Sequence, residues 1–231
     1  MEEILIPSTI EFEETAGANS GSVIITPCFH GYGTTLANAL RRVLLSSLPG
    51  AAVTAVRIKG VQHEFATIEG VKEDVIEICL NLKELNLKCF SQEEVVLRLK
   101  KKGEGEVTAA DIGANADVEI INTDHHILTL TDKSADVDME IVVRQGRGYV
   151  PVEQRDDKNL PLGTIAIDAI YTPVKDVGYK IEATRVGDIT NYEKLTMDIQ
   201  TDGTISVKDA VKQAVAILMN HFTVIKDSAE T

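Results

Sequence analysis

The sequence GYGTTLANALRRVLLSSLPG, at residues 31–50, has an amphipathic pattern between helix-breaking residues. Two glycines open the segment and Pro49-Gly50 closes it. Thr34 or Thr35 can cap a helix that runs to about Ser47. The segment therefore predicts one helix of about three to four turns.

The two sides of this helix differ in character. A wheel at about 100° per residue places Asn38, Arg42 and Leu45 together on the side opposite the apolar one. Arginine is enriched at interaction hot spots, so this side is interpreted as a docking patch centred on Arg42. The alternative is a solvated arginine beside one exposed leucine, which is common on protein surfaces. The apolar side, predicted to pack on a core, consists of Leu36, Leu40, Val43, Leu44, Ser47 and Leu48.

The last helix, which Ser206 is predicted to cap with Asp209 three residues on, has an unusually wide apolar arc. About half of its circumference is apolar, more than the ~100° that packing on one core requires. We therefore expect two partners, the helix's own sheet and a second copy of the chain related by two-fold symmetry. Complete burial within one copy is the alternative. The central stripe is Val207, Val211, Ala214, Val215, Leu218, Phe222 and Ile225, widened by Ile217, Val224 and Met219.

The region between these helices is mostly β-like. Val71 to Leu82 has helical spacing, and short alternating or apolar runs separated by glycine-rich turns predict strands. Together with the flanking helices this gives an α+β pattern. Residues of about 60–175 differ in character from both ends, which indicates an insert between ends that fold together. The expected strands are 23–25, 53–58, 95–99, 118–121, 127–130, 139–143, 164–171, 179–184 and 195–199.

The composition narrows the class of protein. Asp and Glu number 36 against 23 Lys and Arg, for a net charge of −13. That balance disfavours a primary DNA-binding role, which relies on neutralising phosphates. Three cysteines at irregular spacing favour reduced thiols and a cytoplasmic location. No segment approaches the ~20 apolar residues of a membrane span, so no membrane contact is expected.

Candidate chemical sites are weak. Gly31-Tyr-Gly33 precedes a helix and could bind an anion, but Leu36 breaks the GxGxxG pattern, so a turn with positive φ is favoured. Cys28 and His30 are metal-ligand types, but no second pair lies at finger-like spacing. Asp136 with Asp138 could hold Mg²⁺ on one strand face, although a solvated strand edge is favoured. His125-His126 lies in a β-like run, where neighbours point to opposite faces. We expect no catalytic constellation, no metal and no cofactor; an enzyme using these pairs and a ligand-binding module remain alternatives.

Residues 31–50 resemble the signature helix of the bacterial RNA polymerase alpha subunit. Further stretches agree in order, at Gly60–Val75, Leu80–Lys83 and Thr201–Ile205, so the resemblance covers nearly the whole chain. It implies a discontinuous dimerisation domain of an antiparallel sheet plus two helices, at 1–51 and 176–231. A β-rich domain that contacts the large subunits would be inserted at 52–175. The family's separate carboxy-terminal DNA- and activator-binding domain is not expected in this chain, so no promoter contact is expected.

The resemblance also implies partners and contact residues. Two alpha copies pair and scaffold assembly of the β and β′ subunits of DNA-directed RNA polymerase, with no catalytic residue in alpha itself. Arg42, with Leu45 and Asn38, corresponds to the β-contact position. Lys83 resembles the β′-contact position, and Val174 is a weaker correspondence of the same kind. The implied dimer interface comprises Leu36, Leu40, Val43, Leu44, Val211, Val215, Leu218 and Phe222.

Overall fold

The computed structural model describes residues 4–14, 19–155, 161–187 and 189–229. The chain divides into two compact units: unit 1 is Met1–Leu48 with Thr172–Thr231, and unit 2 is Pro49–Tyr171. The boundaries expected at 51/52 and 175/176 lie three and four residues further along the chain. The first junction comes early because Pro49 already pairs with Arg147 inside unit 2.

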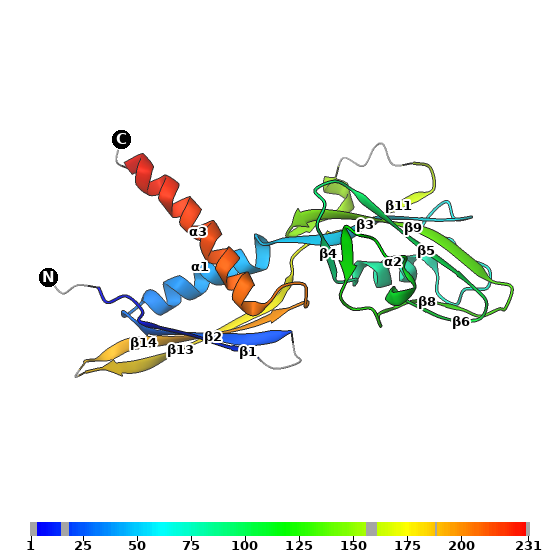
Figure 1. The fold of residues 1–231 in the computed structure, drawn as a ribbon. Helices are drawn as coiled ribbons and strands as arrows, with labels where there is room; N and C mark the ends of the chain where they lie inside the picture. The colour runs from blue at the N-terminus through cyan, green and yellow to red at the C-terminus, as the bar shows by residue number, and fades with distance from the viewer. Residues whose placement is uncertain (1–3, 15–18, 156–160, 188, 230–231) are drawn as a thin grey trace. The chain divides into compact units, whose positions relative to one another are not determined.

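Unit 1 is built on a four-stranded antiparallel sheet in the order β1-β2-β14-β13 (Figure 1). β13 (Val174–Val186) and β14 (Ile189–Thr201) form a long hairpin, and β2 (Ser20–Cys28) pairs with β14. The sequence predicted only the central parts of these three strands. It missed β1 (Thr9–Glu14), all of whose residues are exposed.

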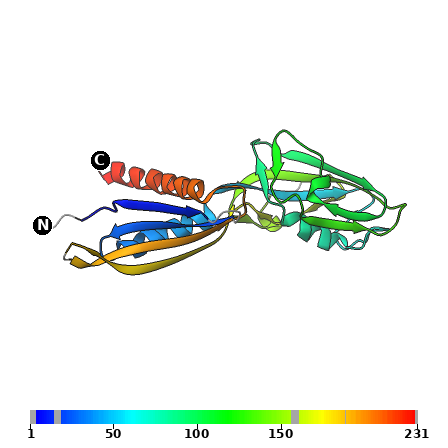
Figure 2. The same ribbon diagram turned by 60° about the horizontal axis from the view of Figure 1, so that its bottom comes forward.

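Two helices, α1 (Tyr32–Ser46) and α3 (Val207–Ala229), lie on one face of this sheet (Figures 1 and 2). The predicted cap of α3 is confirmed, because the Asp209 amide donates to Ser206 Oγ at 3.1 Å. The amino-terminal half of α3 packs against α1 and the sheet. The shared core of unit 1 includes Val23, Leu40, Leu44, Leu48, Val177, Leu195, Met197, Ile199, Val207, Ala210, Val211 and Ala214.

Helix α1 begins earlier than the sequence predicted. Its N-cap is Gly31 with φ of 84°, and the structure shows no side-chain cap from Thr34 or Thr35. The threonines lie inside the first turn, and the Thr35 hydroxyl donates back to the Gly31 carbonyl at 3.2 Å. The favoured reading of this turn, a glycine with positive φ, is confirmed.

Unit 2 is mostly β-structure around one helix. Its six-stranded sheet has the order β5-β9-β3-β4-β7, with β11 also pairing with β3. Two small sheets pair β6 with β8 and β10 with β12. Mixed helix and sheet in both units confirm the α+β class. The strands are β3 (Pro49–Ile58), β4 (Leu87–Cys89), β5 (Val95–Lys102), β6 (Gly105–Thr108), β7 (Val118–Ile120), β8 (His126–Leu130), β9 (Asp136–Arg147), β10 (Tyr149–Val150), β11 (Thr164–Ala166) and β12 (Ala169–Ile170).

Helix α2 (Val75–Lys83) is four residues shorter at its start than the predicted helix. Asp74 caps it by accepting from the Glu77 amide at 2.7 Å. Val71 instead forms a β-bridge with Leu130, so the chain is extended where the apolar spacing suggested helix. The helix buries Val75, Ile78 and Leu82 in the core of unit 2. No helix in the described part of the chain is both long and apolar enough to cross a membrane.

Candidate interaction surfaces

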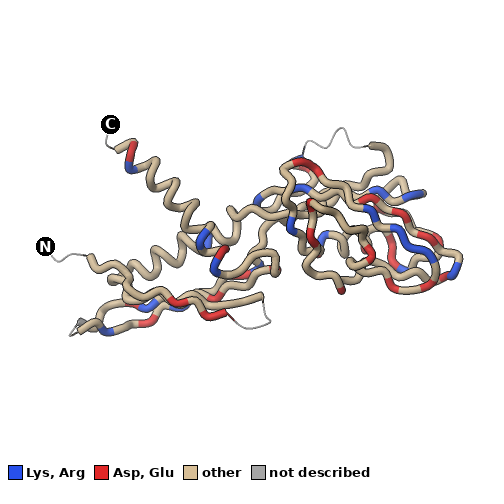
Figure 3. The backbone as a smooth tube through the Cα atoms, viewed as in Figure 1, with Lys and Arg blue, Asp and Glu red and all other residues tan. Residues whose placement is uncertain are grey.

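The carboxy-terminal half of α3 carries a large uncovered apolar surface. Residues 213–225 contain no Lys, Arg, Asp or Glu, and Figure 3 shows this length of α3 without charge. Val215 is 42 % exposed, Met219 58 % and Phe222 57 %. These three follow helical spacing and form the exposed stripe of α3. Val224 and Ile225 are exposed by about two thirds further along.

A second uncovered apolar surface lies on β1. Ile10 pairs with Ile25 and Phe12 with Val23, and directly paired residues share a sheet face. Val23 and Ile25 are buried under the helices, yet Ile10 is 58 % exposed and Phe12 36 %. The helices therefore leave the outer edge of their own sheet face uncovered. Sequence reasoning missed this surface, although Ile10 and Phe12 alternate with Glu11 and Glu13.

The structure corrects part of the interface expected from the resemblance. Leu40, Leu44 and Val211 are at most 7 % exposed and lie in the core of unit 1. These three side chains have almost no surface to offer another chain, because they pack in the core between the sheet and the two helices of unit 1. Leu36, Val43 and Leu218 are half-buried against the same core. Of the expected residues, Val215 and Phe222 are the exposed ones.

The outward side of α1 presents Arg42. Asn38 and Arg42 are exposed, and Arg42 makes no ion pair with any residue that the structure describes. Tyr179 on β13 donates its hydroxyl hydrogen to Asn38 Oδ1 at 3.2 Å, which fixes one end of this side. Leu45 is not bare, as the wheel suggested, but packs partly against the core of unit 1.

Lys83 lies at the end of α2 and is held within unit 2. Its ammonium is 3.2 Å from Asp168 Oδ2 and 5.7 Å from the centre of the Tyr149 ring. Asp168 also accepts from the Val152 amide and the Tyr149 hydroxyl, both at 3.1 Å. The Val152 amide, followed by the Lys83 and Tyr149 contacts, outweighs partial burial and holds the pKa of Asp168 below its ordinary value.

This ion pair borders a cavity of about 400 Å³ in unit 2. Lys83 and Asp168 both line this cavity, and Tyr149 contacts Asp168. Asp168 and Tyr149 carry no local signal in the sequence, since their roles come from pairing across the fold. Val174 does not belong to any exposed surface. It is 1 % exposed in the core of unit 1, so its side chain offers almost no surface for the expected β′ contact.

The conceivable anion site at Gly31–Gly33 is filled by the chain itself. The two amides donate to the two carboxylate oxygens of Glu193, each at 2.9 Å. His30 Nδ1 lies 3.4 Å from the same carboxylate. A carboxylate at a helix amino terminus satisfies the free amides and the dipole together, so no room is left there for a phosphate.

The candidate metal pairs are occupied by other contacts. Asp136 and Asp138 form cross-strand ion pairs with Lys102 and Lys100 on β5. Cys28 is buried, and its thiol donates to the Ile25 carbonyl at 3.6 Å. Among the described residues no three His, Cys, Asp or Glu side chains gather in a way that could hold a metal.

A comparison with known protein families agrees with this arrangement. The model of the RNA polymerase Rpb3/RpoA insert domain matches residues 56–172, just over half of the chain and nearly all of unit 2. The chain therefore belongs to this family and is an alpha-type subunit of RNA polymerase, a nucleotidyltransferase complex in which it assembles with other polymerase subunits for transcription.

Proposed function

We propose that this chain forms a homodimer that scaffolds assembly of the β and β′ subunits and contributes no catalytic residue of its own. The observation that carries the proposal is the exposed stripe of α3. A side chain of this size contributes roughly 1.5–3 kcal/mol when it is fully buried. Three neighbouring side chains of this kind on one helix therefore favour a covering partner.

A second copy of the chain is the partner that this surface supports best. The stripe of α3 and the uncovered edge at Ile10 and Phe12 belong to the same unit. In a two-fold dimer, α3 of each copy can cover the uncovered apolar surface of the other copy. The same set of contacts then forms twice, once on each side of the symmetry axis. We accordingly assign the interface to Val215, Met219, Phe222 and the adjoining half-buried Leu36, Val43 and Leu218.

The β subunit is proposed to bind the outward side of α1. The Arg42 guanidinium carries several hydrogen-bond donors and has no ion-pair partner among the described residues. It is therefore available to bind another protein. Asn38 and the exposed part of Leu45 adjoin it. The β′ subunit is proposed to bind at α2, where Lys83 uses one ammonium hydrogen on Asp168 and retains others for a partner.

Two variant pairs test dimerisation and β capture separately. Phe222→Asp places a charge in the stripe, and Asn220→Asp adds the same charge on another face of the same turn. Light scattering after size exclusion should give a dimer for the wild type and Asn220→Asp, and a folded monomer for Phe222→Asp.

Arg42→Ala should stay dimeric but lose capture of co-expressed β, whereas Arg41→Ala should retain it. A wild-type monomer at micromolar concentration would contradict the proposal.

A further inference from the structure

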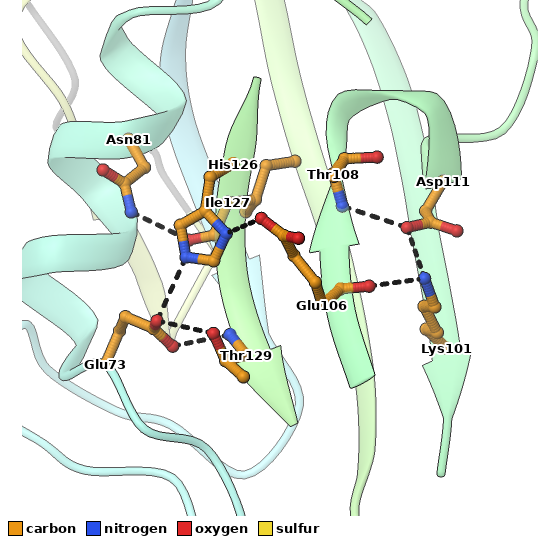
Figure 4. A network of polar contacts seen from close by, with 9 residues as sticks. All are labelled: Glu73, Asn81, Lys101, Glu106, Thr108, Asp111, His126, Ile127 and Thr129. Atoms are coloured by element: carbon orange, nitrogen blue, oxygen red, sulfur yellow. Dashed lines mark hydrogen bonds and ion pairs between the residues drawn. The ribbon is translucent and has the colours of Figure 1, made fainter. Parts of the chain in front are cut away.

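One histidine in unit 2 lies between two carboxylates (Figure 4). His126 Nε2 is 3.0 Å from Glu73 Oε1, and His126 Nδ1 is 2.9 Å from Glu106 Oε1. Glu73 belongs to the segment that leads into α2, His126 begins β8, and Glu106 lies on β6. Three segments distant in sequence therefore meet at one imidazole ring.

The geometry requires a particular protonation state. An ionised carboxylate only accepts hydrogen bonds, so each ring nitrogen that contacts one must carry a hydrogen. Only the imidazolium form has both. A neutral ring has one N–H, and its other nitrogen would turn a lone pair toward a carboxylate oxygen. Loss of one proton therefore breaks one of the two contacts.

The two carboxylates are not equivalent. Glu73 is buried and also accepts from the Thr129 amide at 2.6 Å and the Thr129 hydroxyl at 3.0 Å. Burial alone would raise the pKa of Glu73, but these bonds and the one from His126 lower it below its ordinary value. The Glu106 side chain is 63 % exposed, and among the described residues its carboxylate contacts only His126. When the ring loses a hydrogen, the contact between His126 and Glu106 is therefore the one that breaks first.

The other charged groups around the ring are engaged elsewhere. Lys101 donates to the Glu106 carbonyl at 2.7 Å and to Asp111 Oδ2 at 2.6 Å, so it holds the β6 backbone and leaves the Glu106 carboxylate alone. Asp74 caps α2. His125 contacts the Asn81 carbonyl at 2.9 Å. Among the described side chains, that of His126 contacts both the Glu73 and the Glu106 carboxylate.

We propose that His126 is a pH-dependent clamp that fastens the paired strands β6 and β8 to the segment preceding α2. The clamp is closed while both ring nitrogens carry a hydrogen and opens when one of these hydrogens is lost. Glu73 keeps its bonds to Thr129 in the open state, while the Glu106 side chain is released into solvent. On the acid side the clamp persists until Glu73 is protonated, which its lowered pKa delays. The device belongs to unit 2 and does not depend on dimerisation.

Amide hydrogen exchange and ring NMR on the full chain test the clamp. Glu106→Gln is the informative variant, because an amide can accept from or donate to the ring nitrogen in either state. Glu104→Gln makes the same change on an exposed neighbour and is the control. Between pH 5.5 and 8, protection factors in β6 and β8 should fall about three- to tenfold in the wild type and in Glu104→Gln. They should stay level in Glu106→Gln. At pH 5.5, nitrogen-15 spectra should show the His126 ring protonated at both nitrogens.

Two results would overturn the proposal. One is an equal fall in protection for the wild type and Glu106→Gln, which would mean that the pH effect has another source. The other is a His126 ring with a single proton at pH 5.5, where the clamp should be closed.

Discussion

The Glu193 carboxylate in β14 accepts a 2.9 Å hydrogen bond from the backbone amide of Gly33, 160 residues earlier in the chain. Its second oxygen accepts from Gly31 at the same distance. A side chain from the last strand of the sheet thus caps the first helix, whose own sequence supplies no side-chain cap. Gly33 suits this place, because a Cβ there would lie 2.7 Å from a Glu193 oxygen.

Glu193→Gln should therefore destabilise unit 1. The variant replaces one acceptor oxygen with a donor that faces a backbone amide and removes the charge that complements the helix dipole. We expect the free energy of unfolding to fall by about 1 kcal/mol, the usual cost of a lost cap. Urea unfolding would measure it. Glu13→Gln, an exposed change on β1, should cost far less, and equal losses in both would refute the capping role.

Leu44→Ala and Val215→Ala should separate the core from the interface. Leu44 is fully buried within unit 1, so its truncation should cost about 2–5 kcal/mol of unfolding free energy in any oligomeric state. Val215 is 42 % exposed, so its truncation should scarcely alter the fold but should raise the dimer dissociation constant. Unfolding curves and sedimentation equilibrium would check the two effects. A reversed pattern would mean that the assignment of the two faces is wrong.

The Lys83–Asp168 pair should make unit 2 sensitive to acid. The folded pKa of Asp168 is lowered, so its contribution to stability is present at neutral pH and is lost as the pH falls through that folded value. The loss should begin around the ordinary aspartate pKa of about 3.9 and continue below it. Asp168→Asn should show a shallower decline in stability on acidification, measured by urea unfolding at successive pH values. If stability fell equally with pH in the wild type and in Asp168→Asn, the Lys83–Asp168 pair would not be the source of the acid sensitivity.

Gly146→Ala should destabilise unit 2. A Cβ at position 146 would lie 2.5 Å from the ring of Tyr171, which is buried in the same unit. The ring would have to move, at a cost of about 1–3 kcal/mol that is typical of overpacking. Gly178→Ala, where a Cβ meets no atom within 4 Å, is the matched control in a thermal melt. Equal melting temperatures for the two variants would show that the Tyr171 ring can move aside without loss of stability.

Cys79 should resist alkylation. Burial, followed by the negative charges of Glu64 and Asp74, raises the pKa of its thiol to about 12. The reactive thiolate is then scarce at pH 8. Mass spectrometry after iodoacetamide treatment of the folded protein should find Cys79 unmodified, and treatment in urea should modify it. Rapid labelling of the folded chain would show that the cavity beside Cys79 opens.

The sequence was informative wherever structure follows from local spacing. The periodicity of residues 31–50 and 207–225 predicted two amphipathic helices, and the pattern at Val53–Ile58 predicted a strand that the structure has within β3. The start of α2 was placed too early, because the apolar spacing from Val71 suits a helix but the residue pairs with β8 instead. The resemblance of residues 31–50 to one family is likewise a property of consecutive residues.

Tertiary structure alone decided which apolar side chains are hidden. A wheel gives the direction of a side chain around its helix but not what lies opposite it, so Leu44 and Val215 looked alike until the sheet was in place. The capping of α1 by Glu193 and the pairing of Lys83 with Asp168 could not be predicted for the same reason. Each joins residues that are far apart in sequence, and only the folded backbone sets the distance between them.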